Sequence, residues 1–138
     1  MLIVLDTNVL VSGLLNPHGA PGRILDLVIS GEVQLAFDDR ILSEYWKVLQ
    51  RPKFGFPLGR IEAILDFFQL AGRHISAPPL NLNDVPDRDD LAFAEVALAA
   101  GADALVTGNR DHFDFMKDTV IKVQSPREFV DQWASAER

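Results

Sequence analysis

Short apolar runs alternate with amphipathic segments along this chain. Residues 2–5 (LIVL) form a continuous hydrophobic run rich in β-branched side chains, which is typical of a strand buried on both faces inside a parallel sheet. The same kind of pattern predicts further strands at 33–37 (VQLAF), 74–76 (HIS), 104–107 (ALVT) and 120–123 (VIKV).

Apolar residues at helical spacing fill the stretches between these strands. They predict helices over 23–30, 38–51, 58–71, 91–100 and 126–137. Gly31, Pro52 and Gly72 mark three of the expected ends, and Ser125 is the expected N-cap of the last helix. No helix is predicted before residue 23, where the sequence NPHGAPG (16–22) indicates a loop.

Strands separated by helices imply right-handed crossovers and a mostly parallel sheet that is covered on both faces. The predicted fold class is therefore α/β, a three-layer α/β/α sandwich. The length of 138 residues fits one domain, and neither an internal repeat nor a linker interrupts residues 1–138.

Composition narrows the function classes. The chain has no Cys, which excludes disulfides, thiolate catalysis and zinc–sulfur sites. No leader peptide or long apolar run is evident, so we expect a cytoplasmic protein with no membrane partner. The net charge of −7 disfavours a broad basic surface for nucleic acid, but it allows a nuclease whose acids bind cations.

Several acidic and amide side chains fall where strands end or helices begin. Asp6 ends the first strand, Asp90 opens the helix over 91–100, and Asn109 and Asp111 follow the strand over 104–107. Because the loops after parallel strands gather at one edge of a sheet, we expect Asp6 and the TGNRD loop (107–111) to be neighbours. The alternatives are that Asp6 is a turn residue and that Asp90 is an N-cap.

Glu44 lies at the border of an apolar helix face, because Ile41 and Val48 are one turn away on either side. A carboxylate held there needs a cation or hydrogen-bond donors to offset its desolvation. The alternative is a surface ion pair with Lys47 or Arg40.

Three segments in order, LDTNVLVSG, LSEYWKVLQRPKF and DRDDLAFAEVALAAGADALVTGNRD, resemble the PIN domain family. More narrowly, they are similar to VapC-like PIN proteins described as toxins of type II toxin–antitoxin systems. The resemblance covers almost the whole chain and implies a Mg²⁺- or Mn²⁺-dependent ribonuclease with an acidic metal site. It also implies two protein partners, a small antitoxin and a second copy of the chain in a homodimer.

The family motifs assign roles to individual residues by resemblance. Asp6, Glu44 and Asp90 match the three catalytic, metal-binding acids. The fourth acidic position of the family falls on Asn109, which is a departure. Small polar positions that support the site in the family match Thr7, Asn8 and Thr107.

The residues themselves agree with this assignment, since oxygen ligands without His or Cys favour Mg²⁺ or Mn²⁺. Asp111 is a candidate to replace the missing fourth acid, and the alternative is that it faces solvent or caps a short helix. Because the chain is acidic overall, RNA contact needs a local basic rim, for which Arg51, Lys53 and Arg110 are the candidates.

Three other functions share part of this pattern. A haloacid-dehalogenase-like phosphatase needs a second Asp where Asn8 stands, and a phosphoreceiver domain needs an Asp after the third strand. A PIN fold that has lost activity and only binds RNA or protein is the third, and Asn109 is its one indication. His18, His74 and His112 are predicted to be solvated or in the core, because they lack the spacing of a zinc site.

Overall fold

The computed structural model of the chain describes residues 1–79 and 88–136. Within them, five strands and six α-helices follow one another with two short 3₁₀ helices, η1 and η2. The elements are β1 (Leu2–Leu5), α1 (Thr7–Leu15), α2 (Ala20–Ile29), β2 (Gln34–Phe37), α3 (Asp39–Leu49), η1 (Pro52–Phe54), α4 (Leu58–Ala71), β3 (Arg73–His74), α5 (Arg88–Ala100), β4 (Ala104–Val106), η2 (Arg110–Met116), β5 (Lys122–Gln124) and α6 (Pro126–Ala136).

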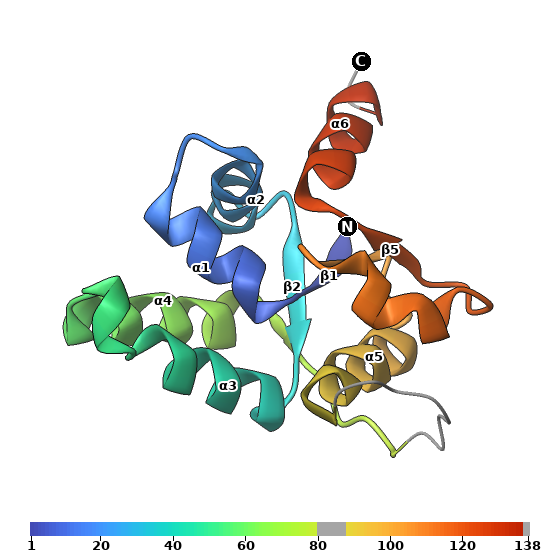
Figure 1. Cartoon of the computed structure of the whole chain (residues 1–138), viewed down its shortest axis with the longest axis horizontal. Coiled ribbons are helices and arrows are strands. Elements are labelled where there is room, and N and C mark those ends of the chain that lie inside the picture. Colours follow the sequence, from blue (N-terminus) through green and yellow to red (C-terminus); the bar gives the residue numbers. More distant parts are fainter. Residues whose placement is uncertain (80–87, 137–138) are drawn as a thin grey trace.

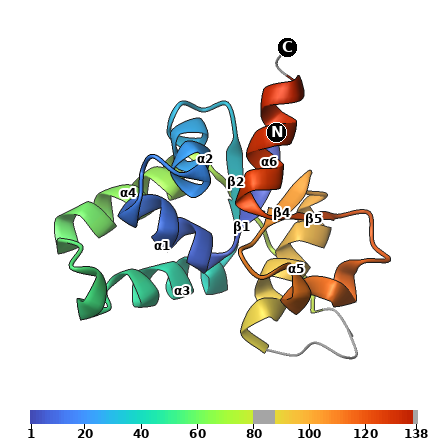
Figure 2. The same cartoon turned by 45° about the horizontal axis from the view of Figure 1, so that its top comes forward.

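The five strands form one parallel sheet in the order β3-β2-β1-β4-β5. Helices α1 to α4 lie on one side of the sheet, and α5 lies with η2 on the other (Figure 1). The tilted view shows the same separation, with α6 standing at the end of the molecule near α2 (Figure 2). The predicted three-layer α/β/α sandwich is confirmed.

The centre of the sheet is the most buried part of the protein. Every residue of β1 and β4 is buried, as their continuous apolar sequences require. Ala94 and Ala97 of α5 are also fully buried, and their small side chains allow this helix to pack closely on the strands.

The prediction that no helix occurs before residue 23 was wrong, because α1 lies there and α2 begins there. Helix α1 starts directly after Asp6, and α2 starts at Ala20 inside the stretch predicted as a loop. Pro21 fits the first turn of a helix, where its missing N–H has no partner to lose. Gly22 is required there because a Cβ would lie 2.2 Å from the carbonyl oxygen of Pro17.

The remaining boundaries differ by a few residues. Helix α5 begins at Arg88, so Asp90 lies inside its first turn rather than before it. Part of the stretch between the predicted strand at 74–76 and the predicted helix over 91–100 lies outside the described residues. The predicted cap of α6 is confirmed, since the Glu128 N–H donates to Ser125 Oγ at 3.1 Å and the Ser125 N–H donates to Glu128 Oε1 at 3.0 Å. Across the described ranges, none of the helices has the length and apolar character needed to span a bilayer.

Candidate active site

The carboxyl ends of β1 and β4 meet at the middle of the sheet. Leu5 pairs with Val106 across these strands, and the Asp6 N–H donates to the Val106 carbonyl at 2.9 Å. The chain leaves β1 toward β2 on one side and later returns to β4 on the other, so the crossover direction reverses beside β1. Ligands of open α/β sheets bind at such a reversal.

Asp6 is held in place from β4. The Thr107 hydroxyl, which is fully buried, donates to Asp6 Oδ2 at 2.7 Å and accepts from the Asn109 N–H at 3.0 Å. Burial raises the pKa of Asp6 above its ordinary value of 3.8, although hydrogen bonds from Thr107 and the Thr7 backbone and the nearby charge of His112 act in the opposite direction. Asp6 is therefore a desolvated acid at the end of β1.

Glu44 reaches the same region from α3. It is half-buried and accepts a hydrogen bond from the Thr7 hydroxyl at the start of α1. The next residue, Tyr45, is buried and donates its hydroxyl to the carbonyl of Leu5, the residue before Asp6. Burial raises the pKa of Tyr45 well above its ordinary value, and the Asp6 and Glu44 carboxylates add to this, so its hydroxyl stays protonated. Helix α3 is thus fixed to the end of β1 beside both acids.

Asp90 comes from the opposite layer. It is 9% exposed in the first turn of α5, and its Oδ2 lies 3.7 Å from His112 Nδ1 in η2. His112 is exposed, which is one of the two predicted alternatives, and its side chain also lines the pocket and faces Asp90. Its place three residues after Asn109, in the loop that follows β4, was the signal that could have found it.

These side chains line one open pocket of about 380 Å³. Four of the five residues predicted as metal ligands contribute to it, and they are Asp6, Glu44, Asp90 and Asn109. Thr7 and Asn8 line it as well, together with Ser12, Arg51, Phe54, Asp89 and His112. The pocket therefore gathers side chains from the residue after β1, from α1, α3 and α5, and from the segments that follow α3 and β4.

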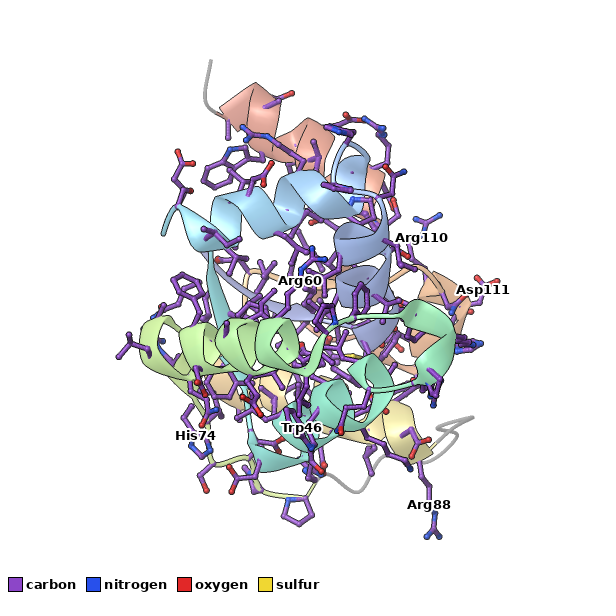
Figure 3. The ribbon with its side chains drawn as sticks, turned by 90° about the vertical axis from the view of Figure 1, so that its left-hand side faces the viewer. Trp46, Arg60, His74, Arg88, Arg110 and Asp111 are labelled. Carbon is purple, nitrogen blue, oxygen red and sulfur yellow. The ribbon has the colours of Figure 1, made fainter. Side chains whose placement is uncertain are left out.

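Asp111 does not share the pocket. It is exposed and lies at the margin of the molecule beside Arg110 (Figure 3). Over residues 1–79 and 88–136, no three Asp, Glu, His or Cys side chains are close enough together to form a ready-made metal site. The acids face a common space without being drawn into one cluster.

A known protein family matches most of this chain. The family model described as "PIN domain" matches residues 2–111, which include every pocket residue up to Asn109. The chain belongs to the PIN domain family. A relative from Methanocaldococcus jannaschii, described as uncharacterized protein MJ1680, is 33% identical over 142 residues that cover 95% of this chain and 90% of that protein.

Two solved structures have the same fold as this PIN domain. The structure of FitAB bound to an IR36 DNA fragment matches with a TM-score of 0.64 and 20% identity, over 90% of this chain and 94% of that one. The structure of VapBC2 from Rickettsia felis, bound to a DNA fragment from its promoter, matches with a TM-score of 0.57 and 20% identity, over 91% and 98% of the two chains. The predicted resemblance is confirmed, and it replaces the phosphatase and phosphoreceiver alternatives.

An ion-pair network links two helices that carry pocket residues of this PIN domain. Arg40 donates to Asp38 Oδ2 at 2.8 Å and to Glu95 Oε1 at 2.6 Å, and Asp38 caps α3 by accepting from the Ile41 N–H at 3.0 Å. The Glu95 side chain is only 2% exposed, whereas that of Arg40 is 48% exposed. The network joins the start of α3 to the middle of α5, the two helices that carry Glu44 and Asp90.

Only one of the three residues predicted to form a basic rim lines the pocket. Arg51 lines it, whereas Lys53 lies with its ammonium 5.2 Å from the ring centre of Phe54. Arg110 forms an ion pair with Glu128 at 3.0 Å and does not line the pocket. Of the three candidates, Arg51 is placed best for contact with a ligand of the site.

Proposed function

We propose that this PIN domain is a ribonuclease that hydrolyses RNA phosphodiester bonds with a Mg²⁺ or Mn²⁺ ion held by Asp6, Glu44 and Asp90. The observation that carries the proposal is that three carboxylates from three separate elements line one pocket at the reversal point of the sheet. Family membership supports nuclease chemistry in general, and the choice of RNA rests on the resemblance of the three motifs to VapC-like proteins.

The donor set suits a hard divalent cation. Carboxylate oxygens and the Asn109 amide oxygen are the ligands that Mg²⁺ and Mn²⁺ prefer, and the chain has no thiolate that would select zinc. Burial raises the pKa of Asp6, so a cation in the pocket would compensate a charge that the fold alone compensates poorly. Because the described acids are not close enough together to form a ready-made metal site, a bound cation would have to bring them closer.

The chain's own residues would then hold the acids and orient the substrate. The Thr107 and Thr7 hydroxyls each donate to one acid, Asp6 and Glu44, which restricts the rotation of both carboxylates before a cation binds. Arg51 supplies positive charge at the pocket for the scissile phosphate. The bound ion would supply an activated water and neutralise charge that develops on the phosphate.

The proposed partners follow from the same similarity. We propose that a small antitoxin protein covers the pocket and that the chain forms a homodimer, as the resemblance to VapC-like PIN proteins implies; of the two structural neighbours, VapBC2 and FitAB, the first shares the Vap name of these proteins. Asn109, in place of the fourth acid, favours one alternative, a PIN fold that binds RNA or protein without cleaving it.

Incubation of the purified chain with a labelled RNA tests the proposal. We expect cleavage with Mn²⁺ or Mg²⁺ and none with EDTA, measured on single-stranded and hairpin RNAs of the same length. Binding without cleavage at any metal concentration would favour the alternative, a non-catalytic binding module.

The amide at position 109 leads to a prediction about metal affinity. Asn109→Asp adds a carboxylate at the pocket, so the Mn²⁺ concentration for half-maximal cleavage should fall by about 10-fold, in the range of changes that neighbouring groups cause at metal sites. Metal titration of the cleavage rate measures this shift. Asp111→Ala is the matched control and should leave the titration unchanged, because Asp111 is exposed away from the pocket. A sharp loss of rate in Asp111→Ala would instead show that this residue replaces the fourth acid.

A further inference from the structure

The connection from α3 to α4, together with the first residues of α4, differs in character from the rest of the chain. Residues 51–60 (RPKFGFPLGR) carry three cationic side chains and no acid, in a protein whose net charge is −7. They also carry two aromatic residues, Phe54 and Phe56, both half-buried. The segment therefore combines positive charge with aromatic surface.

The two rings are arranged as one unit. Their centres are 5.9 Å apart and their planes differ by only 28°, which is a stacked arrangement. Gly55 between them has φ +66, in the left-handed region, and nothing lies within 4 Å of the position where a Cβ would be. This turn allows the side chains of Phe54 and Phe56 to lie on the same side of the backbone.

Cationic groups accompany both rings. The Lys53 ammonium lies 5.2 Å from the centre of the Phe54 ring, and the Arg60 guanidinium lies 5.7 Å from the centre of the Phe56 ring. In Figure 3, Arg60 lies near the middle of the face that α1 and α4 turn toward the viewer. Together, Phe54, Phe56, Lys53 and Arg60 form what we call the aromatic platform.

The platform touches the acid pocket. Phe54 and Arg51 line the pocket together with Asp6, Glu44 and Asp90. A ligand that reaches the acids can therefore contact the Phe54 ring without any rearrangement of the backbone.

Aromatic rings flanked by cations are the usual means of binding single-stranded nucleic acid. Each base offers a π-face that stacks on an aromatic side chain, while lysine and arginine contact the phosphates. In an RNA duplex the bases are stacked on one another, so they are not available to such a platform.

We propose that the aromatic platform binds an unpaired RNA base on Phe54, backed by Phe56, while Arg51, Lys53 and Arg60 contact the neighbouring phosphates. This inference rests on the proposed ribonuclease function and assigns to Phe54 a base-stacking site beside the pocket. The rings also pack against the core, so the test separates stacking from packing.

RNA that contains 2-aminopurine reports base stacking by loss of its fluorescence. The probe is a short single-stranded RNA with one 2-aminopurine, titrated with the protein in EDTA so that no cleavage occurs. Wild-type protein should quench the probe and bind it at least about 10-fold more tightly than the duplex form. Phe54→Leu keeps an apolar side chain of similar bulk, and we expect it to lose the quenching and about 10-fold in affinity.

Phe67→Leu is the matched control. Phe67 is a half-buried phenylalanine of α4 that lines a separate pocket with Val33 and Ala71, so its replacement should leave quenching and affinity as in the wild type. Phe54→Trp should retain quenching, because its ring also stacks.

The outcomes distinguish this inference from the proposed function. If wild-type protein cleaves RNA with Mn²⁺ while Phe54→Leu binds and quenches like the wild type, the platform inference is overturned and the nuclease remains. If the wild type quenches the probe but cleaves nothing with metal, the platform is supported and the nuclease fails. Equal loss of affinity in Phe54→Leu and Phe67→Leu would assign both rings to packing, and absence of RNA binding by the wild type would overturn both proposals.

Discussion

Asp6→Asn is expected to lower the rate of RNA cleavage by more than about 100-fold, because it removes a charged ligand from the middle of the proposed site. Losing a residue that only orients a metal ligand typically costs 10- to 100-fold, so losing the ligand itself should cost more. The shape of the side chain is kept, and its hydrogen bond with Thr107 is still possible. Single-turnover cleavage at saturating Mn²⁺ measures the effect.

The same variant should be more stable than the wild type when metal is absent. The folded-state pKa of Asp6 lies above its ordinary value of 3.8, so the wild type is stabilised below that pH and loses this contribution as the pH rises through the raised pKa. At neutral pH, Asp6→Asn avoids the buried charge, and its melting temperature in EDTA should exceed that of the wild type. The difference should shrink as the pH falls toward 3.8.

Asp103→Asn is the control for this experiment. Asp103 accepts the Leu2 N–H at 2.8 Å, at the opposite end of β1 from Asp6. Its replacement should leave the cleavage rate unchanged. Full activity of Asp6→Asn protein would contradict the proposed metal site, whatever its stability.

Arg40→Ala should be the most destabilising of the single substitutions considered, at about 2–3 kcal/mol. It removes the guanidinium that neutralises the Glu95 carboxylate, which is almost completely buried. The cost is lower than that of breaking a fully buried pair, because Arg40 itself is half exposed and partly screened by water. Urea unfolding followed by circular dichroism measures the change in midpoint.

Arg110→Ala provides the comparison, since it breaks the exposed Arg110–Glu128 pair and should cost less than about 1 kcal/mol. Arg40→Ala should also weaken Mn²⁺ binding, because α3 and α5 lose a link between the helices that carry Glu44 and Asp90. Equal stabilities of the two variants would show that the Arg40–Glu95 pair is not a support of the fold.

The sequence was sufficient for the layers and for the edge at which the site lies. The buried run 2–5, followed by Asp6, and the run 104–107, followed by Asn109, predicted two strands whose ends meet, and the structure pairs Leu5 with Val106. These predictions succeed because parallel strands are read from continuous apolar runs and because their loops share one edge.

What the sequence did not predict depends on local geometry. Helix α1 follows β1 without an intervening turn, and its N-cap Asp6 makes no side-chain capping hydrogen bond, so no turn residues in the sequence separate the strand from the helix. His112 and Asp111 are adjacent in the sequence, yet only His112 lines the pocket. In a short 3₁₀ helix such as η2, a change of one residue turns the side chain by about 120°, so spacing alone could not decide between them.

The pairing of β1 with β4 has a consequence for the synthesis of this protein. Asp6 is made about a hundred residues before the Thr107 hydroxyl and the Val106 carbonyl that hold it. A nascent chain that ends before β4 already has Asp6, Glu44 and Asp90 and can pair β1 with β2, but it lacks the strand end that holds Asp6. The pocket is therefore completed only after β4 has been made, and contacts of such long sequence separation also slow folding. Under the proposed ribonuclease function, this order keeps a growing chain from cleaving the RNA from which it is being made.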